Sequence, residues 1–450
     1  MTTRSIVALL LIATTAHATI LTWTGGGGDN NFSTTSNWDT GTAPVDNDDL
    51  IFDGSTRLTP NNDLTINTEF DSITFAAGAG AFVVGGIDYH LGGNITNASA
   101  NSQEIAMKAV LQQDVTIDCD TALEISETMS GAFGVTKTGS ATLTLSDFNS
   151  FTTYLQIDEG CVQFAGSGGD LDDSCNLTNS SGCTVSWNLT SGYTIRYSLA
   201  GDGGWSFGSG DGSDVNYNIN PDANTNSISG TLYLTNSNTR VNLSDGAASI
   251  GSVSDIYAQD GQLYLSVADT YTQACYIAGT GYPDTDPGPY GAIRINSPTD
   301  TVIEVSGPIT LTDDATIGTR GRGTNLLSGS ISGDYTLSLR PWTTAGAEPI
   351  TLAPSGNANS FKSMSCDSYG YVKLGNTNAL NLQRVYFTES GALLFNSISE
   401  TIPALYVSGT QQAAGTWGAT GSGSANTNDS IFADTGGTFT VVWPRYLKLQ

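Results

Sequence analysis

Short apolar segments recur along almost the whole sequence, and each alternates hydrophobic residues with Thr, Ser, Tyr or Asn. Typical examples are Thr142–Leu145, Thr231–Leu234 and Thr336–Leu339. A period of two points one side chain toward a core and the next toward solvent, as in a β-strand. The segments are about three to five residues long, and clusters of Gly, Asn, Asp and Ser, which favour turns, separate them. We therefore predict an all-β chain of many short strands.

The composition favours a stack of coils over a row of compact domains. The sequence has 53 glycines, only 13% of its residues are charged, and no window shows the sustained 3.6-residue period of a helix. No unit repeats at the length of a domain, as it would in a tandem immunoglobulin-like array. In a coil of short parallel strands, each turn buries its apolar side chains against the turns on either side. We predict a β-solenoid.

The start of the chain has the pattern of an export signal. Arg4 precedes the apolar run Ile6–Ala13, and a small-x-small motif ends at Ala18. The run is shorter than the roughly 20 residues that cross a bilayer. We predict a signal peptide over residues 1–18, no membrane-spanning segment in the mature chain, and a secreted or cell-surface protein.

The ends of a solenoid expose strand edges, which need caps. Residues 19–54 are aromatic and irregular, and are predicted to form the N-terminal cap. Residues 55–404 form the predicted solenoid, and residues 405–450 the C-terminal cap.

The chain is strongly acidic. It has 15 basic and 43 acidic residues, for a formal net charge of -28. Such a surface repels nucleic acid and anionic membranes, so neither is an expected partner. The charge also keeps an exported protein soluble and can attract divalent cations.

Six cysteines leave two possibilities open. An even number in an exported chain permits disulfides, and a bridge between Cys175 and Cys183 could close the loop between them. Alternatively, the cysteines are small buried hydrophobic residues. A Cys/His zinc site is not expected, because His90 is the one histidine left after signal removal.

The segment Met129–Val162 contains a specific motif. Lys137-Thr138-Gly139 is followed by Leu143-Thr144-Leu145-Ser146, then by Asn149 and by Gly160 before an apolar residue. This pattern resembles the autotransporter-associated β-strand repeat, although Thr153-Tyr154 stands where the family usually has glycines. Residues 329–380 resemble a second, degenerate copy, with Asn359-Ser360-Phe361 at the Asn-aromatic step. The two ends of the chain also resemble long proteins of this group.

The resemblance implies a right-handed parallel β-helix that is exported and displayed. Lys137, Gly139, Asn149 and Gly160 are then architectural residues, which shape turns and bond along the stack. An autotransporter also has a C-terminal membrane barrel of strands of about 10 alternating residues. We find no such set and expect a stand-alone passenger-like protein or a fragment.

Catalysis is not expected. Glycoside hydrolysis needs two carboxylates that flank the bond, and the acid pairs of this chain lie in segments typical of solvated turns. The Gly-His-Gly and Arg-Ile-Lys motifs of polygalacturonases are missing, and Arg294-Ile295-Asn296 is the nearest match. A lyase would pair calcium with a basic residue, but no aligned set of acids supports one. A polysaccharide lyase or glycoside hydrolase therefore stays as the alternative.

Two kinds of binding site are candidates. Calcium prefers oxygen ligands, and Asp46, Asp48 and Asp49 crowd one loop. Further acids cluster at residues 170–173 and 284–286. In the Gly-rich stretch 192–217, Trp205 and Tyr217 could form a glycan-binding face, or they could fill the core. We expect an exported, non-catalytic structural or adhesive protein whose partners are glycans or cell-surface components, with a carbohydrate-binding or carbohydrate-cleaving protein as the alternative.

Overall fold

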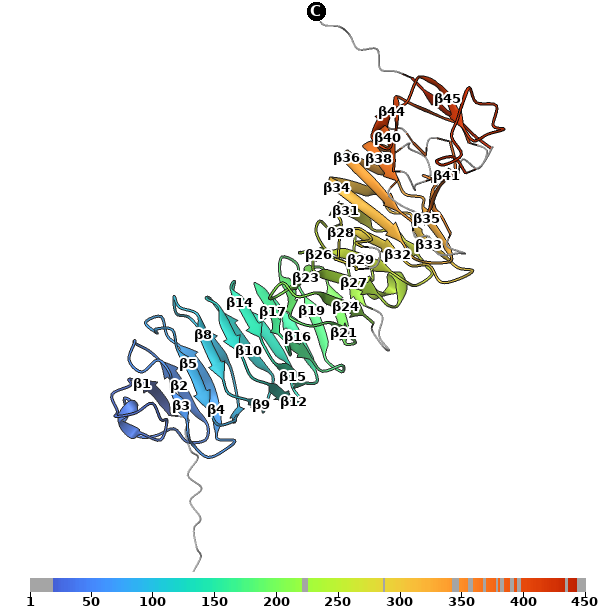
Figure 1. Cartoon of the computed structure of the whole chain (residues 1–450). Coiled ribbons are helices and arrows are strands. Elements are labelled where there is room, and N and C mark those ends of the chain that lie inside the picture. The colour runs from blue at the N-terminus through green and yellow to red at the C-terminus, as the bar shows by residue number, and fades with distance from the viewer. Residues whose placement is uncertain are drawn as a thin grey trace, which may run out of the picture.

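The computed structural model describes residues 19–442, apart from residues 221–225, 286–287, 342–347, 355–358, 367–369, 378, 381–383, 389–391, 395–397 and 434–435. In this part of the chain, 51% of the residues are in strands and 2% in helices. The strands stack in parallel coils, about 15 in number, and form an elongated β-solenoid with the first and last described strands at opposite ends of the stack (Figure 1). The predicted fold class is confirmed. The predicted signal peptide lies outside the described residues.

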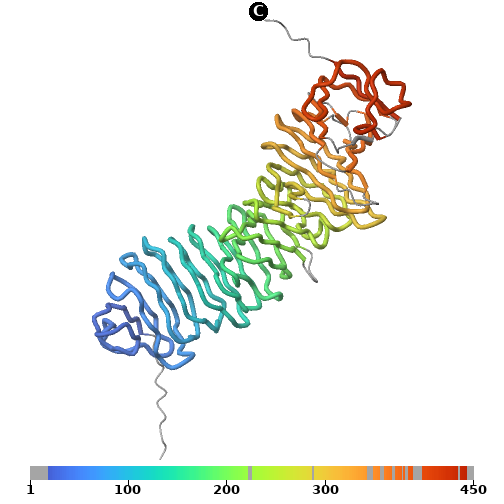
Figure 2. Tube along the Cα trace, viewed as in Figure 1, coloured from blue at the N-terminus to red at the C-terminus, as the bar shows by residue number. Residues whose placement is uncertain are grey.

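The strands form long ladders, one strand per coil (Figure 2). The first ladder contains β1 (Ile20–Trp23), β2 (Asp48–Phe52), β4 (Glu69–Phe75), β7 (Ile95–Asn97), β10 (Val115–Cys119), β13 (Val135–Thr138), β16 (Tyr154–Ile157), β19 (Asn176–Asn179), β22 (Ser198–Gly201) and β25 (Ser227–Ile228). A second ladder beside it contains β6 (Tyr89–Leu91), β9 (Ala109–Leu111), β12 (Met129–Gly131), β15 (Phe148–Phe151) and β18 (Asp170–Leu171).

The third ladder follows nearly the whole stack. It contains β3 (Asn61–Asn62), β5 (Val83–Gly86), β8 (Gln103–Ala106), β11 (Leu123–Ile125), β14 (Thr142–Leu145), β17 (Cys161–Gly166), β20 (Thr184–Leu189), β23 (Gly204–Ser209), β26 (Thr231–Leu234), β28 (Asp255–Ala258), β31 (Ala274–Gly279), β34 (Ile309–Thr319), β36 (Ile331–Arg340), β38 (Ser360–Cys366), β40 (Arg384–Phe387), β43 (Ala404–Val407) and β44 (Thr410–Gln411).

Two further ladders appear in the later coils. One contains β21 (Tyr193–Ile195), β24 (Val215–Ile219), β27 (Thr239–Leu243), β29 (Gln262–Leu265) and β32 (Ile293–Ile295), and joins β34. The other contains β30 (Thr270–Tyr271), β33 (Val302–Val305), β35 (Thr324–Leu327), β37 (Ile350–Leu352), β39 (Tyr371–Leu374) and β41 (Ala392–Leu394). The two short 3-10 helices are η1 (Thr35–Asn37) and η2 (Gly246–Ile250).

The predicted N-terminal cap residues continue the stack. Strand β1 pairs in parallel with β2, and β2 pairs in parallel with β4. Four aromatic side chains pack together at this end, with ring centroids 5.2–6.3 Å apart: Trp23, Phe32, Trp38 and Phe52. They fill the apolar side of the first coil in the described part of the chain.

The C-terminal residues pair differently from the coils. Strand β44 is antiparallel to β43. A four-stranded sheet follows, in which β47 (Phe439–Val441) is parallel to β42 (Glu400–Ile402) and antiparallel to β45 (Gly415–Gly418), and β46 (Asn426–Thr427) pairs with β45. Phe432 and Phe439 are buried beneath it. Antiparallel pairing breaks the register of the coils, and it uses strand edges that a further coil would otherwise occupy.

In the alternating segments, the apolar side chains point inward and the polar ones outward, as the pattern predicts. In β14, Leu143 and Leu145 are buried while Thr142 and Thr144 are partly exposed. The register places Leu143 between Leu123 and Val162 of the adjacent coils. Each coil therefore gains its stability from its neighbours, as in other repeat proteins.

Lys137 occupies an inward position of the first ladder. The register aligns the following residues of successive coils: Ile73, Ile95, Ile117, Lys137 and Ile157. The Lys137 side chain is fully buried, and burial lowers its pKa. Its Nζ donates hydrogen bonds to the carbonyl oxygens of Thr138 (2.6 Å), Gly139 (2.7 Å) and Glu159 (3.2 Å). Backbone carbonyls of two coils thus replace the water that solvates an ammonium group.

The other residues of the motif also shape the coil. Gly139 has a φ of 74°, and a Cβ there would lie 2.5 Å from the Cys119 carbonyl oxygen. Buried Asn149 accepts a hydrogen bond at its Oδ1 from the backbone N–H of Met129, in the preceding coil, at 2.9 Å. Asn359 does the same for Ile331 at 2.8 Å. The degenerate second copy therefore keeps the asparagine that links one coil to the next.

Candidate functional site on the outer face of the central coils

The predicted calcium ligands hold the backbone of the first coils. Asp48 is 3% exposed, and its carboxylate accepts hydrogen bonds from the N–H groups of Thr19 (3.0 Å) and Val45 (2.8 Å). Asp46 accepts one from the N–H of Glu69 (3.0 Å), and Asp49 one from the Ser72 hydroxyl (2.5 Å). The three carboxylates thus have separate partners. Within the described ranges, no group of three His, Cys, Asp or Glu side chains is arranged to hold a metal ion.

Asp46 also lines a surface cavity of about 340 Å³ between residues 44–46 and 64–68. The rest of its lining is apolar or neutral, and includes exposed Val45 and Ile66. A calcium ion prefers six to eight oxygen ligands. Calcium binding by Asp46, Asp48 and Asp49 stays a prediction.

The other acidic clusters are likewise not brought together. Asp170 is 3% exposed, and burial raises its pKa to about 8. Asp172 accepts hydrogen bonds from the backbone N–H (2.9 Å) and hydroxyl (2.5 Å) of Ser174, in a local turn. Asp284 pairs with two arginines, as described below, and Asp286 lies outside the described residues.

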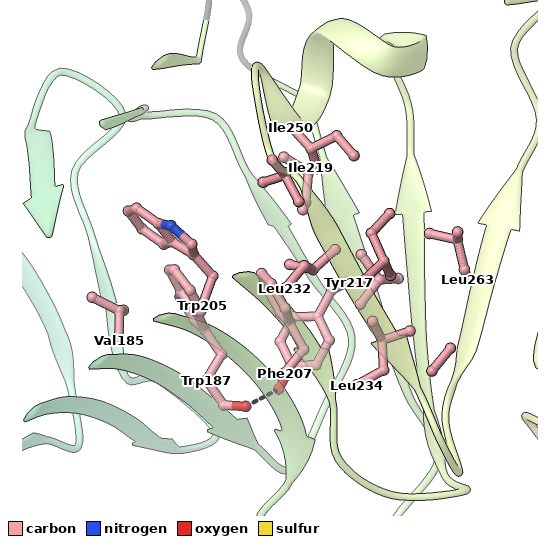
Figure 3. Packing of buried hydrophobic residues seen from close by; sticks show 14 of the residues in the cluster. Val185, Trp187, Trp205, Phe207, Tyr217, Ile219, Leu232, Leu234, Ile250 and Leu263 are labelled. Atoms are coloured by element: carbon pink, nitrogen blue, oxygen red, sulfur yellow. Dashed lines mark hydrogen bonds between the residues drawn. The ribbon is translucent and has the colours of Figure 1, made fainter. Parts of the chain in front are cut away.

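Trp205 and Tyr217 are not available to a glycan. Both are fully buried, and they point into the coil interior with other core residues (Figure 3). Trp205 lies 6.2 Å from Trp187, nearly parallel to it, and the Tyr217 hydroxyl donates to the Trp187 carbonyl oxygen at 3.1 Å. The prediction of a glycan-binding face at these two residues is wrong. They lie on inward register positions of β23 and β24, and so fill the core.

The cysteines act as small core residues. Cys175 and Cys183 are 1% and 4% exposed and are not bonded to each other. Burial raises the pKa of the Cys175 thiol to about 12. Of the two possibilities that the sequence left open, buried hydrophobic side chains describe this pair.

A row of tyrosines lies on the outside of the third ladder. Tyr233, Tyr257 and Tyr276 occupy one register position on β26, β28 and β31. Their rings are stacked, with centroids 5.3 Å and 4.5 Å apart. Tyr233 is 40% exposed. Sequence reasoning missed this row because unequal coil lengths separate the three residues.

A second outward feature combines arginines and tyrosines. The ring of Tyr282 and the guanidinium of Arg240 lie 4.1 Å apart, and Tyr264 is 5.4 Å from Arg240 and 4.9 Å from Arg294. Tyr290 then stacks on Arg294 at 4.6 Å. Aromatic rings and guanidinium groups thus alternate in one column, which we call the Arg–Tyr column. The central carbon of each guanidinium lies within 5.4 Å of two ring centroids, an arrangement that favours cations.

The strands position this column through their register. Arg240 lies on β27, Tyr264 on β29 and Arg294 on β32, all pointing outward, and Tyr264 is the register partner of Arg294. Residues 281–285 and 288–291, which we call the covering segment, bring Tyr282, Asp284 and Tyr290 against the two arginines, and Arg294 is buried. A Cβ at Gly318 would lie 2.3 Å from the Tyr290 carbonyl oxygen, so this close approach needs glycine. From the sequence alone, Arg294 is the nearest match to a polygalacturonase motif and a basic residue available to a lyase, and neither pattern indicates its place in this column.

Comparison with known proteins does not place the chain in a family. No family model, no curated protein and no solved structure matches it. Along the described residues, no helix has the length and apolar character to cross a membrane.

Proposed function

We propose that this chain is an exported, non-catalytic structural or adhesive protein that presents an elongated surface to its surroundings. The main support is the continuity of the stack. One cluster of buried hydrophobic residues extends from Leu21 near one end to Val441 near the other. Such a core favours a rigid rod, and its outward side chains are repeated once per coil.

The roles of the motif residues also support an architectural function. Lys137 and Asn149 are buried, and their polar atoms bond to backbone groups within and between coils. We include membership of the autotransporter-associated repeat proteins in this proposal, because the motif residues do in the coils what the resemblance implies. Fold alone does not determine activity, so the proposal needs direct tests.

Export can be tested in cells that express the full-length chain. We expect the mature protein to begin at Thr19 and to be degraded when intact cells or the culture medium are treated with protease. N-terminal sequencing and fractionation measure both points. A chain that keeps residues 1–18 and stays protected inside intact cells would contradict the proposal.

The lack of catalysis can be tested on the purified mature chain. A panel of acidic and neutral polysaccharides, with millimolar calcium present, should yield no reducing ends and no unsaturated products above a boiled control. Release of either product would favour the enzyme alternative.

Carbohydrate binding without cleavage is the second candidate function. The observation that favours it is the outer face of the central coils, where the tyrosine row and the Arg–Tyr column lie. Sugar rings pack against aromatic side chains with a polar tip. A glycan array with and without calcium separates this function from a purely structural one.

A further inference from the structure

The Arg–Tyr column contains a carboxylate that belongs to the chain itself. Oδ1 of Asp284 accepts hydrogen bonds from Nη2 of Arg240 and from Nη1 of Arg294, the latter at 2.8 Å. Its Oδ2 accepts one from Nε2 of Gln262 at 3.3 Å. Three side chains from three coils thus converge on a single carboxylate, which belongs to the covering segment.

Gln262 holds the Arg240 guanidinium in place from the buried side of the cluster. Its Oε1 accepts from Nε of Arg240 at 2.6 Å, and its Nε2 also donates to the Gly291 carbonyl oxygen at 3.0 Å. Gln262 is fully buried. Because one guanidinium is held by a buried amide and each guanidinium contacts two rings, the donors are oriented before any ligand binds.

The ion pairs of this cluster are unequal in number. Among the described residues, the two guanidiniums share the carboxylate of Asp284, while burial and the nearby carboxylate of Asp214 raise the pKa of Tyr282. Arg294 is 6% exposed, and its Nε has no hydrogen-bond partner. A buried cation that is only half neutralised is costly unless a further anion or a polar group reaches it.

Solvent reaches the carboxylate itself. The side chains of Asp284 and Arg240 are 12% and 14% exposed, whereas that of Arg294 is 7% exposed. The covering segment is held at its base, where the Gly291 N–H donates to the Thr280 carbonyl oxygen at 2.9 Å. The Asp284 side chain therefore lies at the open edge of the cluster, with the more deeply buried arginine beneath it.

We propose that this cluster is a binding site for the carboxylate of an acidic sugar, such as a uronic acid, and that Asp284 occupies the site in its absence. Planar guanidiniums match a carboxylate in geometry as well as in charge. Tyr282, which is partly exposed and has only Arg240 against its ring, supplies a surface against which a pyranose can pack. The sugar carboxylate takes the place of the Asp284 carboxylate between Arg240 and Arg294, and no covalent step is involved.

The proposal names a ligand for the proposed function and rests on it, because only an exported surface meets extracellular glycans. The two can fail separately. Export is measured by protease treatment of intact cells, which does not depend on whether a uronic acid binds.

The test is calorimetric titration with a trimer of galacturonate at low ionic strength. Asp284→Asn removes the internal competitor and keeps the side-chain shape, so we expect this variant to bind about tenfold more tightly than the parent. The matched control is Asp313→Asn, which changes the net charge equally at an exposed position on β34. The methyl-esterified trimer, which has no free carboxylate, should not bind to either variant.

Arg240→Gln keeps the proposal testable if Asp284→Asn disturbs the fold. Arg240 is the more exposed of the two arginines, and its replacement should abolish the weak binding that saturation-transfer NMR detects with the parent. Equal affinities of Asp284→Asn and Asp313→Asn, or no binding by the parent in either measurement, would overturn the proposal. Binding of the methyl ester as tight as that of the acid would overturn it too.

Discussion

The early coils and the central coils bury positive charge in two different ways. Lys137 points inward, and three backbone carbonyls solvate its ammonium group. Arg240 and Arg294 point outward beneath a covering segment, and they share the side-chain carboxylate of Asp284. Carbonyls of the coil cannot leave without unfolding it, whereas a carboxylate on a side chain can be exchanged. The inner charge is therefore part of the architecture, and the outer one suits binding.

The largest expected effect comes from reversing the inner charge. Lys137→Glu would place a carboxylate against three carbonyl oxygens, with no donor within the coil, and should destabilise the protein by at least about 3 kcal/mol. Lys137→Met keeps an unbranched side chain of similar length and removes the buried charge, so it should cost less, about 1–3 kcal/mol for the carbonyls left unpaired. Urea unfolding followed by circular dichroism measures both. A Lys137→Glu variant as stable as the parent would show that the inner charge is not architectural.

Asp170 is a buried acid in the early coils, where Lys137 is a buried base. Unlike Asp284, Asp170 is not ion-paired with arginines. An unfolded aspartate titrates near 3.8 and Asp170 near 8, so the native state binds the extra proton between these values. The stability of the parent should therefore fall as pH rises from about 4 to about 8. Asp170→Asn should remove this loss, on the order of 5 kcal/mol at pH 8.

Thermal or urea unfolding of the parent and of Asp170→Asn at several pH values measures this difference. Asp313→Asn, at an exposed position on β34, is the matched control and should follow the parent. Identical pH dependence of the parent and Asp170→Asn would mean that the carboxyl of Asp170 ionises normally in the folded protein.

The smallest effects concern neutral polar groups, which both repeat copies share. Asn149→Ala and Asn359→Ala should each cost about 1–3 kcal/mol, because each leaves a buried backbone N–H unpaired, that of Met129 or of Ile331. Since the two residues lie in coils far apart (Figure 1), the costs should add within about 0.5 kcal/mol. If Asn359→Ala leaves the stability unchanged, residues 329–380 resemble the repeat in sequence but do not depend on its asparagine for stability.

The solenoid was predictable because its signal is local. Alternation in Thr142–Leu145 assigns the buried face of that strand from four residues, and the structure agrees. The same rule could not assign Trp205 and Tyr217 to the buried or the exposed face of their strands, because glycine-rich neighbours hide the alternation. An aromatic ring can also pack in a core as well as against a sugar. The register of β23 and β24 decides between these roles, and it depends on how long each coil is.

The Arg–Tyr column could not be predicted for a related reason. Arg240 and Asp284 are 44 residues apart, and their contact needs two coils in register together with a segment that folds back over them. No spacing rule encodes such a contact. An acidic residue after Pro283, in a chain with few arginines, was the one available signal, and it suggested calcium instead.

The placement of the first and last described strands at opposite ends of the stack has a mechanical consequence. A solenoid under tension between these strands is loaded along its long axis, across the hydrogen bonds that join one coil to the next (Figure 1). Because each coil contacts only its neighbours, force opens the stack one coil at a time from a loaded end. Each opened coil releases about 20 residues of slack chain, so a sudden pull is absorbed as extension before it reaches the coils that remain.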